Sequence, residues 1–547
     1  MGIPSYFKHL LDRYPRLLTP AGPDTKANVL LMDFNCLIYG CVHSKSLPAY
    51  SHATREEWET ALLKEICTYV LHLWTIAGKP EQVVLAVDGV VPMAKIRQQR
   101  LRRFKSVWLT GKEREFGARP AGEELWDTNC ITPGTEFMER LTVKLEELCS
   151  KKGGWTVSGA EKPGEGEQKL MEWVRSAEPG ALDGKHLMVY GLDADLILLC
   201  MLHANLDAAV NWSILREKQE FIKVAVPNLE SAAKYPACLL LSITGLLTTL
   251  FPDPATRTAH LYDYIAGMSL LGNDFIPHSL GVHLKDAGHD RLIAVLATIH
   301  SEGVALVSQE LARGGREHFW RWNPVALKKI LEFWGSTEEA DLEHAFKRKF
   351  AMRTHPPKTQ AERVMLPLQN LPLESGEEGR MWNRGTGKLY PDWRAQYSIE
   401  KRTRALTSVE IEERCSEYFK GLQWVLDYYT GQRPISEEWM FPWTYPPLWT
   451  DLRVFLEGNS LPEVLGALGS SRIKPQEQLT LVLPLESWSL IRNPVLKAVP
   501  AAAPHFWPRS FTFTTLGKRW MWECPPDIPI LTLRRLLALT TSKRTVT

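Results

Sequence analysis

Three apolar runs that each end in aspartate constrain the fold of this chain more than any other feature of its sequence. They are "NVLLMD" (28–33), "QVVLAVD" (82–88) and "HLMVYGLDAD" (186–195). Their apolar residues are continuous rather than alternating, which is typical of strands that are buried on both faces of a parallel sheet. Helical patterns lie between them, at 55–74 and 134–150. The sequence therefore predicts an α/β fold with a mostly parallel sheet that is flanked by helices.

The length of the chain beyond the α/β pattern predicts a second domain. A chain of 547 residues is too long for one ordinary hydrophobic core. The stretch 301–400 is charged, rich in helical patterns and poor in strand patterns, with an exposed loop expected at 371–380. Further on, "GLQWVLDYY" (421–429) has the aromatic spacing of a core helix. We expect an α/β domain over residues 1–300 and a mainly helical domain over residues 301–547.

Charge and cysteine content narrow the class of protein. The 65 Lys and Arg residues nearly balance the 63 Asp and Glu residues, so the net charge argues neither for nor against a nucleic-acid partner. The nine cysteines lack the spacing of a zinc site, which favours a reducing, cytoplasmic environment. The longest apolar stretch, 237–251, is too short and too rich in hydroxyl groups to span a bilayer. We expect a soluble intracellular protein without a membrane partner.

Carboxylates at strand ends and tight turns form the first candidate site. Parallel strands end at one edge of a sheet, where the ligands of such folds bind. One such acid alone is more often a helix cap or a solvated loop residue, but a cluster of them would repel unless divalent cations bind it. Oxygen ligands favour Mg²⁺ or Mn²⁺, and two such ions suit phosphodiester cleavage. The candidate catalytic and metal-binding residues are Asp33, Asp88, Glu165, Glu167, Asp193, Asp195 and Asp274.

Two of these acids need a particular turn. Glu165 and Glu167 are two residues apart, so they would not share one face of a helix. They can act together only if "PGEGE" (163–167) is the turn that enters the helix "EQKLMEWVR" (167–175), which its glycines permit.

A cluster of cations follows Asp88 closely. If "AKIRQQRLRRFKS" (94–106) is a helix, one lysine, one amide and two guanidinium groups share a face, namely Lys95, Gln99, Arg102 and Arg103. These groups would make a pocket for a dianion, since arginine binds phosphate oxygens in a bidentate manner. A solvated basic face is the commoner fate of such a run, but this helix begins a few residues after Asp88. We predict that it holds a terminal phosphate while the carboxylates cut the next phosphodiester.

With these motifs in place, the chain resembles the Xrn family of 5′→3′ exoribonucleases over most of residues 1–530. The family's first conserved region resembles "MGIPSYFKHLLDRYP", "AVDGVVPMAKIRQQRLRRF", "NCITPGTEFM", "PGEGEQKLM", "YGLDADLILL" and "LLGNDFIPH", in this order and spacing. The second resembles "GLQWVLDYY", "WMFPWTYPP" and "KPQEQLTLVLP", and the closing stretch resembles "LGKRWMWE".

The resemblance implies a PIN/flap-nuclease-like α/β domain over 1–300, braced by the family's mainly helical second region over 301–547. It implies that the seven acids bind two Mg²⁺ ions, which Mn²⁺ can replace, and that Lys95, Gln99, Arg102 and Arg103 bind a 5′-monophosphate. Tyr39 stands where the family usually has the histidine that stacks on the first base. The ring of Tyr39 can still stack on a base, but it cannot take over a role that depends on protonation of the histidine. Trp439 is the second candidate for stacking, and Trp443 is a weaker one.

The implied function is processive 5′→3′ digestion of single-stranded RNA with a 5′-monophosphate, releasing nucleoside 5′-monophosphates. The alternatives are a catalytically silent RNA-end-binding protein that keeps the fold, and a DNA-directed flap-type nuclease. All seven acids are present, which argues against the first; no helix-hairpin-helix pattern is evident, which argues against the second. The long C-terminal extension and the zinc-knuckle insertion of other members are not seen, as expected for a minimal core such as a compact viral or protist version.

Overall fold

The computed structural model of this chain describes residues 5–22, 24–218, 234–311, 318–353, 356–400, 404–462 and 473–541. The chain forms two compact units that interleave along the sequence. Unit 1 comprises Met1–Val91, Glu124–Tyr262 and Ile473–Leu479, and unit 2 comprises Pro92–Glu123, Asp263–Arg472 and Thr480–Thr547. The first four residues of the N-terminal motif lie outside the described residues. The expected division at residue 300 rests on sequence patterns and stays a prediction.

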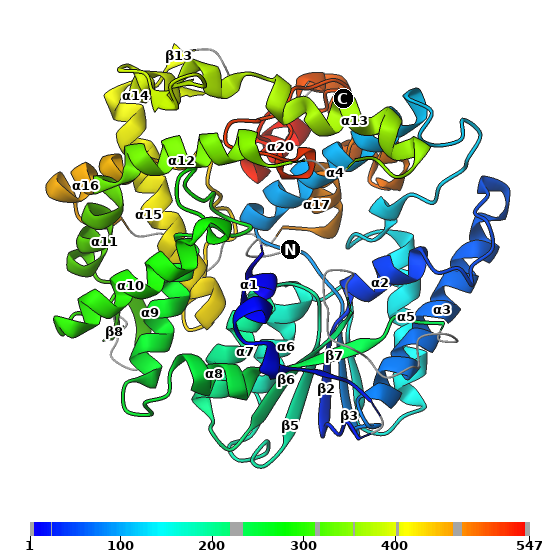
Figure 1. Cartoon of the computed structure of the whole chain (residues 1–547). Coiled ribbons are helices and arrows are strands. Elements are labelled where there is room, and N and C mark those ends of the chain that lie inside the picture. Colours follow the sequence, from blue (N-terminus) through cyan, green and yellow to red (C-terminus); the bar gives the residue numbers. More distant parts are fainter. Residues whose placement is uncertain are drawn as a thin grey trace. The chain divides into compact units, whose positions relative to one another are not determined.

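Unit 1 is built on a seven-stranded sheet, and the three aspartate-terminated runs are adjacent strands of it, β5, β2 and β3 (Figure 1). The strand order is β1-β7-β6-β5-β2-β3-β4, with bounds Leu18–Pro20, Cys238–Ser242, Asn211–Glu217, His186–Tyr190, Val29–Asp33, Gln82–Ala86 and Trp155–Ser158. The strands from β6 to β4 run parallel, whereas β7 is antiparallel to β6 and to β1. Residues 29–32 of β2 are fully buried, as continuous apolar strands require.

Helices of unit 1 cover this sheet, which confirms the predicted α/β class. α6 packs against β2 and β3, whereas α7 and α8 pack against β6. The helices expected at 55–74 and 134–150 are α3 and α5. The bounds in this unit are Tyr6–Arg13 for α1, Asn35–Val42 for α2, Arg55–Ile76 for α3, Glu136–Ser150 for α5, Gly166–Arg175 for α6, Asp195–Leu206 for α7 and Ile243–Leu250 for α8.

Unit 2 is mainly helical, as the sequence predicts. Its longest helices are α4 (Met93–Glu115) and α15 (Ser408–Thr430). The others within the unit are α10 (Gly288–Ser301), α11 (Pro324–Ser336), α12 (Glu338–Ala351), α13 (Gln360–Glu374), α14 (Trp393–Tyr397), α16 (Trp449–Gly458), α18 (Pro494–Lys497), α19 (Val499–Ala502) and α20 (Leu533–Thr541). Two helices contain residues of both units, namely α9 (Arg257–Ser269) and α17 (Pro475–Val482).

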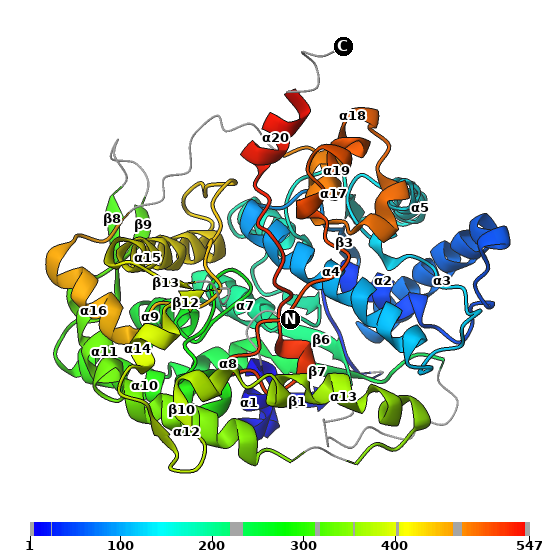
Figure 2. The same ribbon diagram turned by 90° about the horizontal axis from the view of Figure 1, so that it is seen from above.

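The aromatic helix α15 is a centre of packing in unit 2. Residues 421–430 of this helix are buried, so the prediction of a core helix there is confirmed. It lies beside α16 and the hairpin strand β9 (Figure 2). The ring of Trp424 stacks on Tyr428 at a centroid distance of 5.0 Å and lies 5.3 Å from the ring of Trp439.

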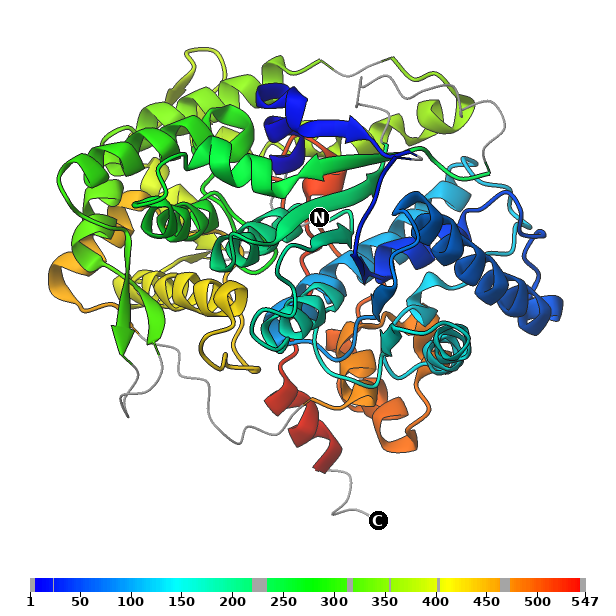
Figure 3. The ribbon, with the colours of Figure 1, turned by 90° about the horizontal axis from the view of Figure 1, so that it is seen from below.

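The expected strand-poor stretch 301–400 contains an antiparallel hairpin. Its strands are β8 (Val307–Leu311) and β9 (His318–Trp322), and it runs beside α15 (Figure 3). The sequence "HFWRW" buries Trp320 and Trp322 on one face of β9, which is the alternation of a half-buried strand. Two shorter hairpins follow, made of β10 (Trp382–Asn383) with β11 (Lys388–Leu389) and of β12 (Ile399–Glu400) with β13 (Arg404–Ala405).

The prediction of an exposed loop at 371–380 is wrong. α13 continues to Glu374, and a short 3₁₀ helix spans Glu377–Arg380 with Glu377 and Glu378 buried. Lys349 pairs with Glu378 at 2.6 Å, and Glu377 accepts hydrogen bonds from the backbone amides of Thr515 and Leu516. These partners are distant in sequence, so the run of acids alone gave no sign of them.

All nine cysteines lie among the described residues and are free thiols. Across the ranges that the structure describes, no helix combines the length and the apolar character needed to cross a membrane.

Candidate active site

The carboxyl edge of the unit 1 sheet gathers three of the predicted acids. Asp33 is the last residue of β2, Asp88 follows β3, and Asp193 follows β5. Because these three strands are parallel neighbours, their carboxyl ends lie at the same edge (Figure 1). The convergence that the sequence predicts by topology is therefore present in the structure.

The environment of Asp33 shows that the carboxylates form one electrostatic cluster. Burial is the largest cause that raises the pKa of Asp33 well above its usual value. Repulsion adds to this effect and comes from four other acids, in decreasing order Asp88, Asp193, Glu165 and Asp195. Asp33 and four other predicted acids therefore lie close together within unit 1.

The turn into α6 brings Glu165 to this cluster and places Glu167 in the first turn of the helix. Gly164 adopts a left-handed φ of +106°, and its amide donates to the carbonyl of Val90 at 2.7 Å. Glu165 then occupies the N-cap position of α6 and Glu167 lies in its first turn, and both residues are 5% exposed. The prediction that "PGEGE" is the turn entering the helix is confirmed. Carboxylates at this position are also stabilised by the positive end of the helix dipole.

Gly166 lies so close to the carboxylates that a side chain would not fit there. Its amide donates to Oδ1 of Asp88 at 2.7 Å. A Cβ atom on this residue would lie 2.5 Å from Oδ1 of Asp33 and 2.7 Å from the carbonyl oxygen of Ala86. The N-terminus of α6 is therefore packed directly against the ends of β2 and β3.

The loop after β5 is held by a buried arginine that sequence analysis did not single out. Asp195 begins α7 and is 2% exposed, whereas Asp193 is half-buried in the loop. Arg216 in β6 donates to the carbonyl of Leu192 at 3.1 Å, next to Asp193. Burial lowers the pKa of Arg216 to about 10, although Glu217 and Asp193 partly oppose the shift. The only sequence signal was an arginine near the end of the mixed run "NWSILRE".

A second cation that sequence analysis missed is Lys169 in α6. Its ammonium group donates to the carbonyls of Val87 and Gly159 at 2.7 and 2.8 Å. Burial lowers the pKa of Lys169 to about 8, and the nearby charge of Asp88 opposes this shift. Lys169 thus fixes the chain just before Asp88 through the backbone.

The seventh predicted acid, Asp274, belongs to unit 2, where it forms an ion pair. Nζ of Lys95 lies 3.0 Å from Oδ2 of Asp274, and the two side chains are 9% and 8% exposed. Lys95 also lies 5.8 Å from the centroid of the Phe275 ring. The lysine predicted to bind phosphate and the acid predicted to bind metal are thus direct partners within this unit.

The predicted helix that carries the cations is α4, and its cations divide into two groups. The predicted phosphate-binding residues all lie on it, with Gln99 and Arg103 half-buried and Arg102 exposed. Three other cations of the run bind backbone carbonyls of unit 2. Arg97 donates to Trp443, Arg100 to Leu481 and Phe506, and Lys105 to Met521 and Cys524. Half of the basic run therefore stabilises the fold of this unit.

The two predicted stacking residues differ in exposure. Tyr39 in α2 of unit 1 is 40% exposed, so its ring is open to a ligand. Trp439 in unit 2 is 8% exposed, and its Nε1 donates to Glu417 at 3.0 Å. A Cβ on Gly421 would lie 2.8 Å from the Trp439 ring, so this ring packs closely on α15. The weaker candidate, Trp443, is half-buried and lines a cavity in unit 2.

An α/β unit with buried carboxylates at the carboxyl edge of a parallel sheet is typical of metal-dependent hydrolases that use acidic ligands. Comparisons with known proteins identify the family. The family model described as "XRN 5'-3' exonuclease N-terminus" matches residues 1–218, and the model "Xrn1 helical domain" matches residues 344–545. This chain belongs to the Xrn family of 5′-3′ exoribonucleases, whose nucleases are metal-dependent.

Curated relatives agree with this assignment along nearly the whole chain. The "5'-3' exoribonuclease 1" of Homo sapiens is 28% identical over 98% of this chain and 34% of its own length. The proteins of the same name from Schizosaccharomyces pombe and Saccharomyces cerevisiae are each 25% identical, over 48% and 43% of their lengths. The chain thus spans about a third to a half of the length of these relatives.

Proposed function

We propose that this chain is a processive 5′→3′ exoribonuclease that digests RNA with a 5′-monophosphate and releases nucleoside 5′-monophosphates. The observation that carries the proposal is the carboxylate cluster at the carboxyl edge of the unit 1 sheet, where burial and, after it, repulsion from four other acids raise the pKa of Asp33. Such a cluster is unfavourable by itself and becomes favourable when divalent cations bind it. Membership of the Xrn family supports the same activity.

The residues of the cluster fit Mg²⁺. Their donor atoms are all carboxylate oxygens, which hard cations such as Mg²⁺ and Mn²⁺ prefer. The buried cations nearby, Lys169 and Arg216, are bound to backbone carbonyls. We propose that two ions are held by Asp33, Asp88, Glu165, Glu167, Asp193, Asp195 and Asp274, with Mn²⁺ able to replace Mg²⁺. When bound, two such ions about 3.5–4 Å apart supply an activated water and stabilise the leaving oxygen.

The protein's own groups would position the RNA. In the proposal, Lys95, Gln99, Arg102 and Arg103 hold the 5′-monophosphate through charge-assisted hydrogen bonds. A cap or a triphosphate would be too large for such a pocket. Tyr39 and Trp439 would stack on bases near the 5′ end. Such stacking does not depend on the RNA sequence, because every base has an aromatic face. A channel that admits one strand would make the digestion processive.

The nine free thiols support a reducing, cytoplasmic location.

A catalytically silent RNA-end-binding protein is the second candidate, and one observation favours it. Oδ2 of Asp274 is paired with Nζ of Lys95 at 3.0 Å, so the negative charge that this carboxylate can offer to a metal ion is partly neutralised. In the exoribonuclease proposal either Oδ1 of Asp274 binds the ion while the pair persists, or the pair opens when metal and RNA bind.

Matched RNAs test the proposal. Purified protein is incubated with MgCl₂ or EDTA and with 3′-labelled RNAs that carry a 5′-monophosphate or a 5′-hydroxyl. The expected result is Mg²⁺-dependent release of mononucleotides from the 5′-phosphorylated RNA, and none by Asp195→Asn, which retains RNA binding. Tight binding of 5′-phosphorylated RNA without any cleavage in Mg²⁺ or Mn²⁺ would support the silent binder instead.

A further inference from the structure

Two buried cations of unit 1 bind the backbone directly before predicted metal ligands. The first is Lys169 in α6, which is 7% exposed. Its ammonium group donates to the carbonyl of Val87 at 2.7 Å, and the next residue in the chain is Asp88. It also donates at 2.8 Å to the carbonyl of Gly159, which follows the neighbouring strand β4. Lys169 therefore ties the segment that carries Asp88 to the next strand of the sheet.

The second cation is Arg216 in β6, which is 3% exposed. Its guanidinium group donates to the carbonyl of Leu192 at 3.1 Å, and the next residue in the chain is Asp193. The ring of Phe7 in α1 lies against the same guanidinium group, with the ring centroid 3.5 Å from Cζ. Arg216 is thus held by an aromatic ring as well as by the carbonyl that it binds.

Hydrogen bonds to these carbonyls orient the acids because of the geometry of the peptide bond. The carbonyl of one residue and the amide nitrogen of the next belong to one planar group. A cation that fixes the carbonyl of Val87 therefore also fixes the nitrogen of Asp88. The same holds for Leu192 and Asp193. From that nitrogen on, the position of each carboxylate depends on the φ angle and the side-chain torsions of the acid.

The loop that carries Asp193 lies beside another acid of the cluster. A Cβ atom on Gly191 would lie 3.5 Å from Cβ of Asp33, so the loop passes next to the end of β2. The amide of Gly191 donates to the carbonyl of Leu215 in β6 at 3.2 Å. The loop is thus anchored to β6 at two successive residues, Gly191 and Leu192. A displacement of this anchor would change the separation of the carboxylates of Asp33 and Asp193.

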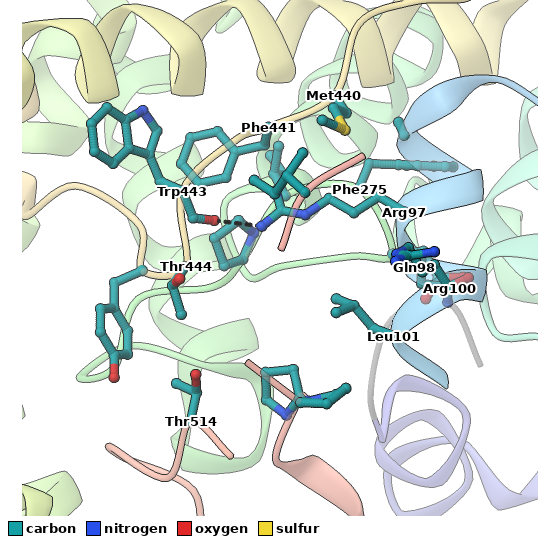
Figure 4. Close-up of a pocket in the computed structure, with 18 of the residues that line it drawn as sticks. Arg97, Gln98, Arg100, Leu101, Phe275, Met440, Phe441, Trp443, Thr444 and Thr514 are labelled. Atoms are coloured by element: carbon teal, nitrogen blue, oxygen red, sulfur yellow. Dashed lines mark hydrogen bonds between the residues drawn. The ribbon is translucent and has the colours of Figure 1, made fainter. Parts of the chain in front are cut away.

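Other cations of this protein also bind carbonyls, but a different kind of residue follows those carbonyls. Figure 4 shows Arg97 of α4 reaching the carbonyl of Trp443, where the next residue is Thr444. The carbonyls that accept from Arg100 and Lys105 are likewise followed by apolar or aromatic residues. A buried cation therefore does not need an acid next to its acceptor, whereas each of the two cations described above has one.

We propose that Lys169 and Arg216 are positioning residues, which set the affinity of the carboxylate cluster for divalent cations by orienting Asp88 and Asp193 through the backbone. The inference rests on the metal site of the proposed exoribonuclease. Because both cations donate to carbonyls, these hydrogen bonds do not occupy the carboxylate oxygens, which metal ions would bind.

Positioning and simple charge compensation predict opposite results. A cation near the cluster repels a divalent ion, so its removal would tighten metal binding if charge were its only effect. If the cation orients a ligand, its removal weakens metal binding, typically by about 10- to 100-fold for groups that orient metal ligands. The sign of the change in affinity therefore separates the two roles.

Titration with MnCl₂ measures this affinity without RNA and without cleavage. The free ion is followed by electron paramagnetic resonance, at a temperature where every variant is folded. Arg216→Met and Lys169→Met keep the length of each side chain but remove its donors and its charge, so each should weaken Mn²⁺ binding at least about tenfold. Arg216→Gln, which has a shorter polar side chain, replaces Arg216→Met if the latter does not fold, with the same expected result.

Arg257→Met is the matched control in the same unit. Arg257 donates to the carbonyls of Phe251 and Pro252, at 2.8 and 3.3 Å, and no predicted metal ligand follows either residue. This variant should bind Mn²⁺ as the wild type does, even if it melts earlier. An equal loss of affinity in Arg257→Met would overturn the inference, because any lost anchor of the backbone would then suffice.

The wild-type titration distinguishes failure of the inference from failure of the proposed function. If the wild type binds Mn²⁺ and the variants at positions 169 and 216 bind it equally well or more tightly, the metal site stands and the positioning role is overturned. If the wild type itself does not bind Mn²⁺, the proposed metal site is overturned together with the inference that rests on it.

Discussion

Lys95 and Asp274 form a buried ion pair in unit 2, with Nζ 3.0 Å from Oδ2 and both side chains less than a tenth exposed. Lys95 is predicted to hold phosphate and Asp274 to hold metal, so in the proposal the two groups either share their contacts with the ligands or exchange each other for them. Such an exchange is feasible because a buried pair is close to neutral in net stability, whereas a single buried charge is costly.

Removing one partner of this pair should destabilise the protein. Lys95→Met leaves the carboxylate of Asp274 buried without its cation, so we expect a loss of about 3–5 kcal/mol in the free energy of unfolding. Lys95→Met combined with Asp274→Leu removes both charges and should recover most of that loss. Urea unfolding of the two variants and the wild type measures the difference. Equal destabilisation in both variants would mean that packing, not charge pairing, sets the stability there.

Gly166→Ala should damage the carboxylate cluster without altering any acid. The added Cβ would lie 2.5 Å from Oδ1 of Asp33 and 2.7 Å from the carbonyl of Ala86, and a backbone atom cannot move aside cheaply. We expect a loss of about 1–3 kcal/mol, as for other overpacked sites, together with weaker stabilisation by Mg²⁺ in thermal unfolding.

Gly111→Ala is the matched control for this prediction. Gly111 is also helical, and its Cβ would meet nothing within 4 Å. The change should stabilise the protein slightly, since alanine is favoured over glycine in helices by up to about 1 kcal/mol. If Gly166→Ala were equally harmless, the tight packing of α6 against β2 would not constrain the site.

The parts of the site that follow from periodicity and topology can be predicted from the sequence. β2, β3 and β5 are continuous apolar runs, and parallel strands must end at one edge, so Asp33, Asp88 and Asp193 are brought together by the fold class alone. The turn before α6 can be predicted because its sequence contains Gly164, and glycine readily adopts the left-handed backbone conformation that this turn uses.

The parts that depend on long-range partners cannot be predicted in this way. Arg100 binds the carbonyl of Leu481, which is 381 residues away, and Lys105 binds that of Met521. A backbone carbonyl has no residue type, so no pattern in the sequence identifies it as a partner. For the same reason the sequence did not separate Arg97, Arg100 and Lys105, which bind backbone carbonyls, from the other cations of α4.

The pH dependence of stability should report the burial of Lys105. Burial lowers its pKa from 10.5 to about 8. Between these values the unfolded chain still binds a proton at Lys105 that the folded chain has lost, so stability rises with pH across this window. Below pH 8 the cost of burying the charge is present in full.

Lys105→Met isolates this effect from other titrating groups. The stability of the wild type relative to Lys105→Met should rise between pH 8 and pH 10.5, measured by urea unfolding at constant ionic strength. The neutral amine keeps two hydrogens for the two carbonyls that it contacts, those of Met521 and Cys524. A difference between the two proteins that stays constant over this range would show that Lys105 titrates normally.

Arg102→Ala with Arg103→Ala should erase the preference for 5′-phosphorylated RNA. Each charge-assisted hydrogen bond contributes about 1.5–3 kcal/mol, so digestion of the 5′-phosphorylated RNA should slow at least about tenfold. Digestion of 5′-hydroxyl RNA should change far less. Arg114→Ala is the control, because Arg114 is an exposed cation near the end of the same helix. Equal slowing of both substrates would mean that the pair binds the RNA backbone in general.

The last prediction separates stacking from packing at Tyr39 and Trp439. Tyr39 is 40% exposed, so Tyr39→Ala should leave stability within about 0.5 kcal/mol and still slow digestion of every RNA, because base stacking contributes about 1–3 kcal/mol. Tyr39→Phe keeps the ring and should be mild. If Trp439 stacks on bases drawn from a duplex, Trp439→Ala should slow digestion through a stable hairpin far more than digestion of an unstructured strand.

Trp439→Phe makes this test specific, because the structure also gives Trp439 a packing role. The indole donates to Glu417 at 3.0 Å and lies 5.3 Å from the ring of Trp424, so removing it should also cost about 3–5 kcal/mol of stability. Phenylalanine keeps an aromatic face but loses the hydrogen bond, and it should restore most of the hairpin digestion. Gel time courses with both RNAs, run well below the melting temperature of each variant, decide between the roles. Equal slowing of both RNAs by Trp439→Ala would assign this residue to the core of unit 2, where its 8% exposure already places it.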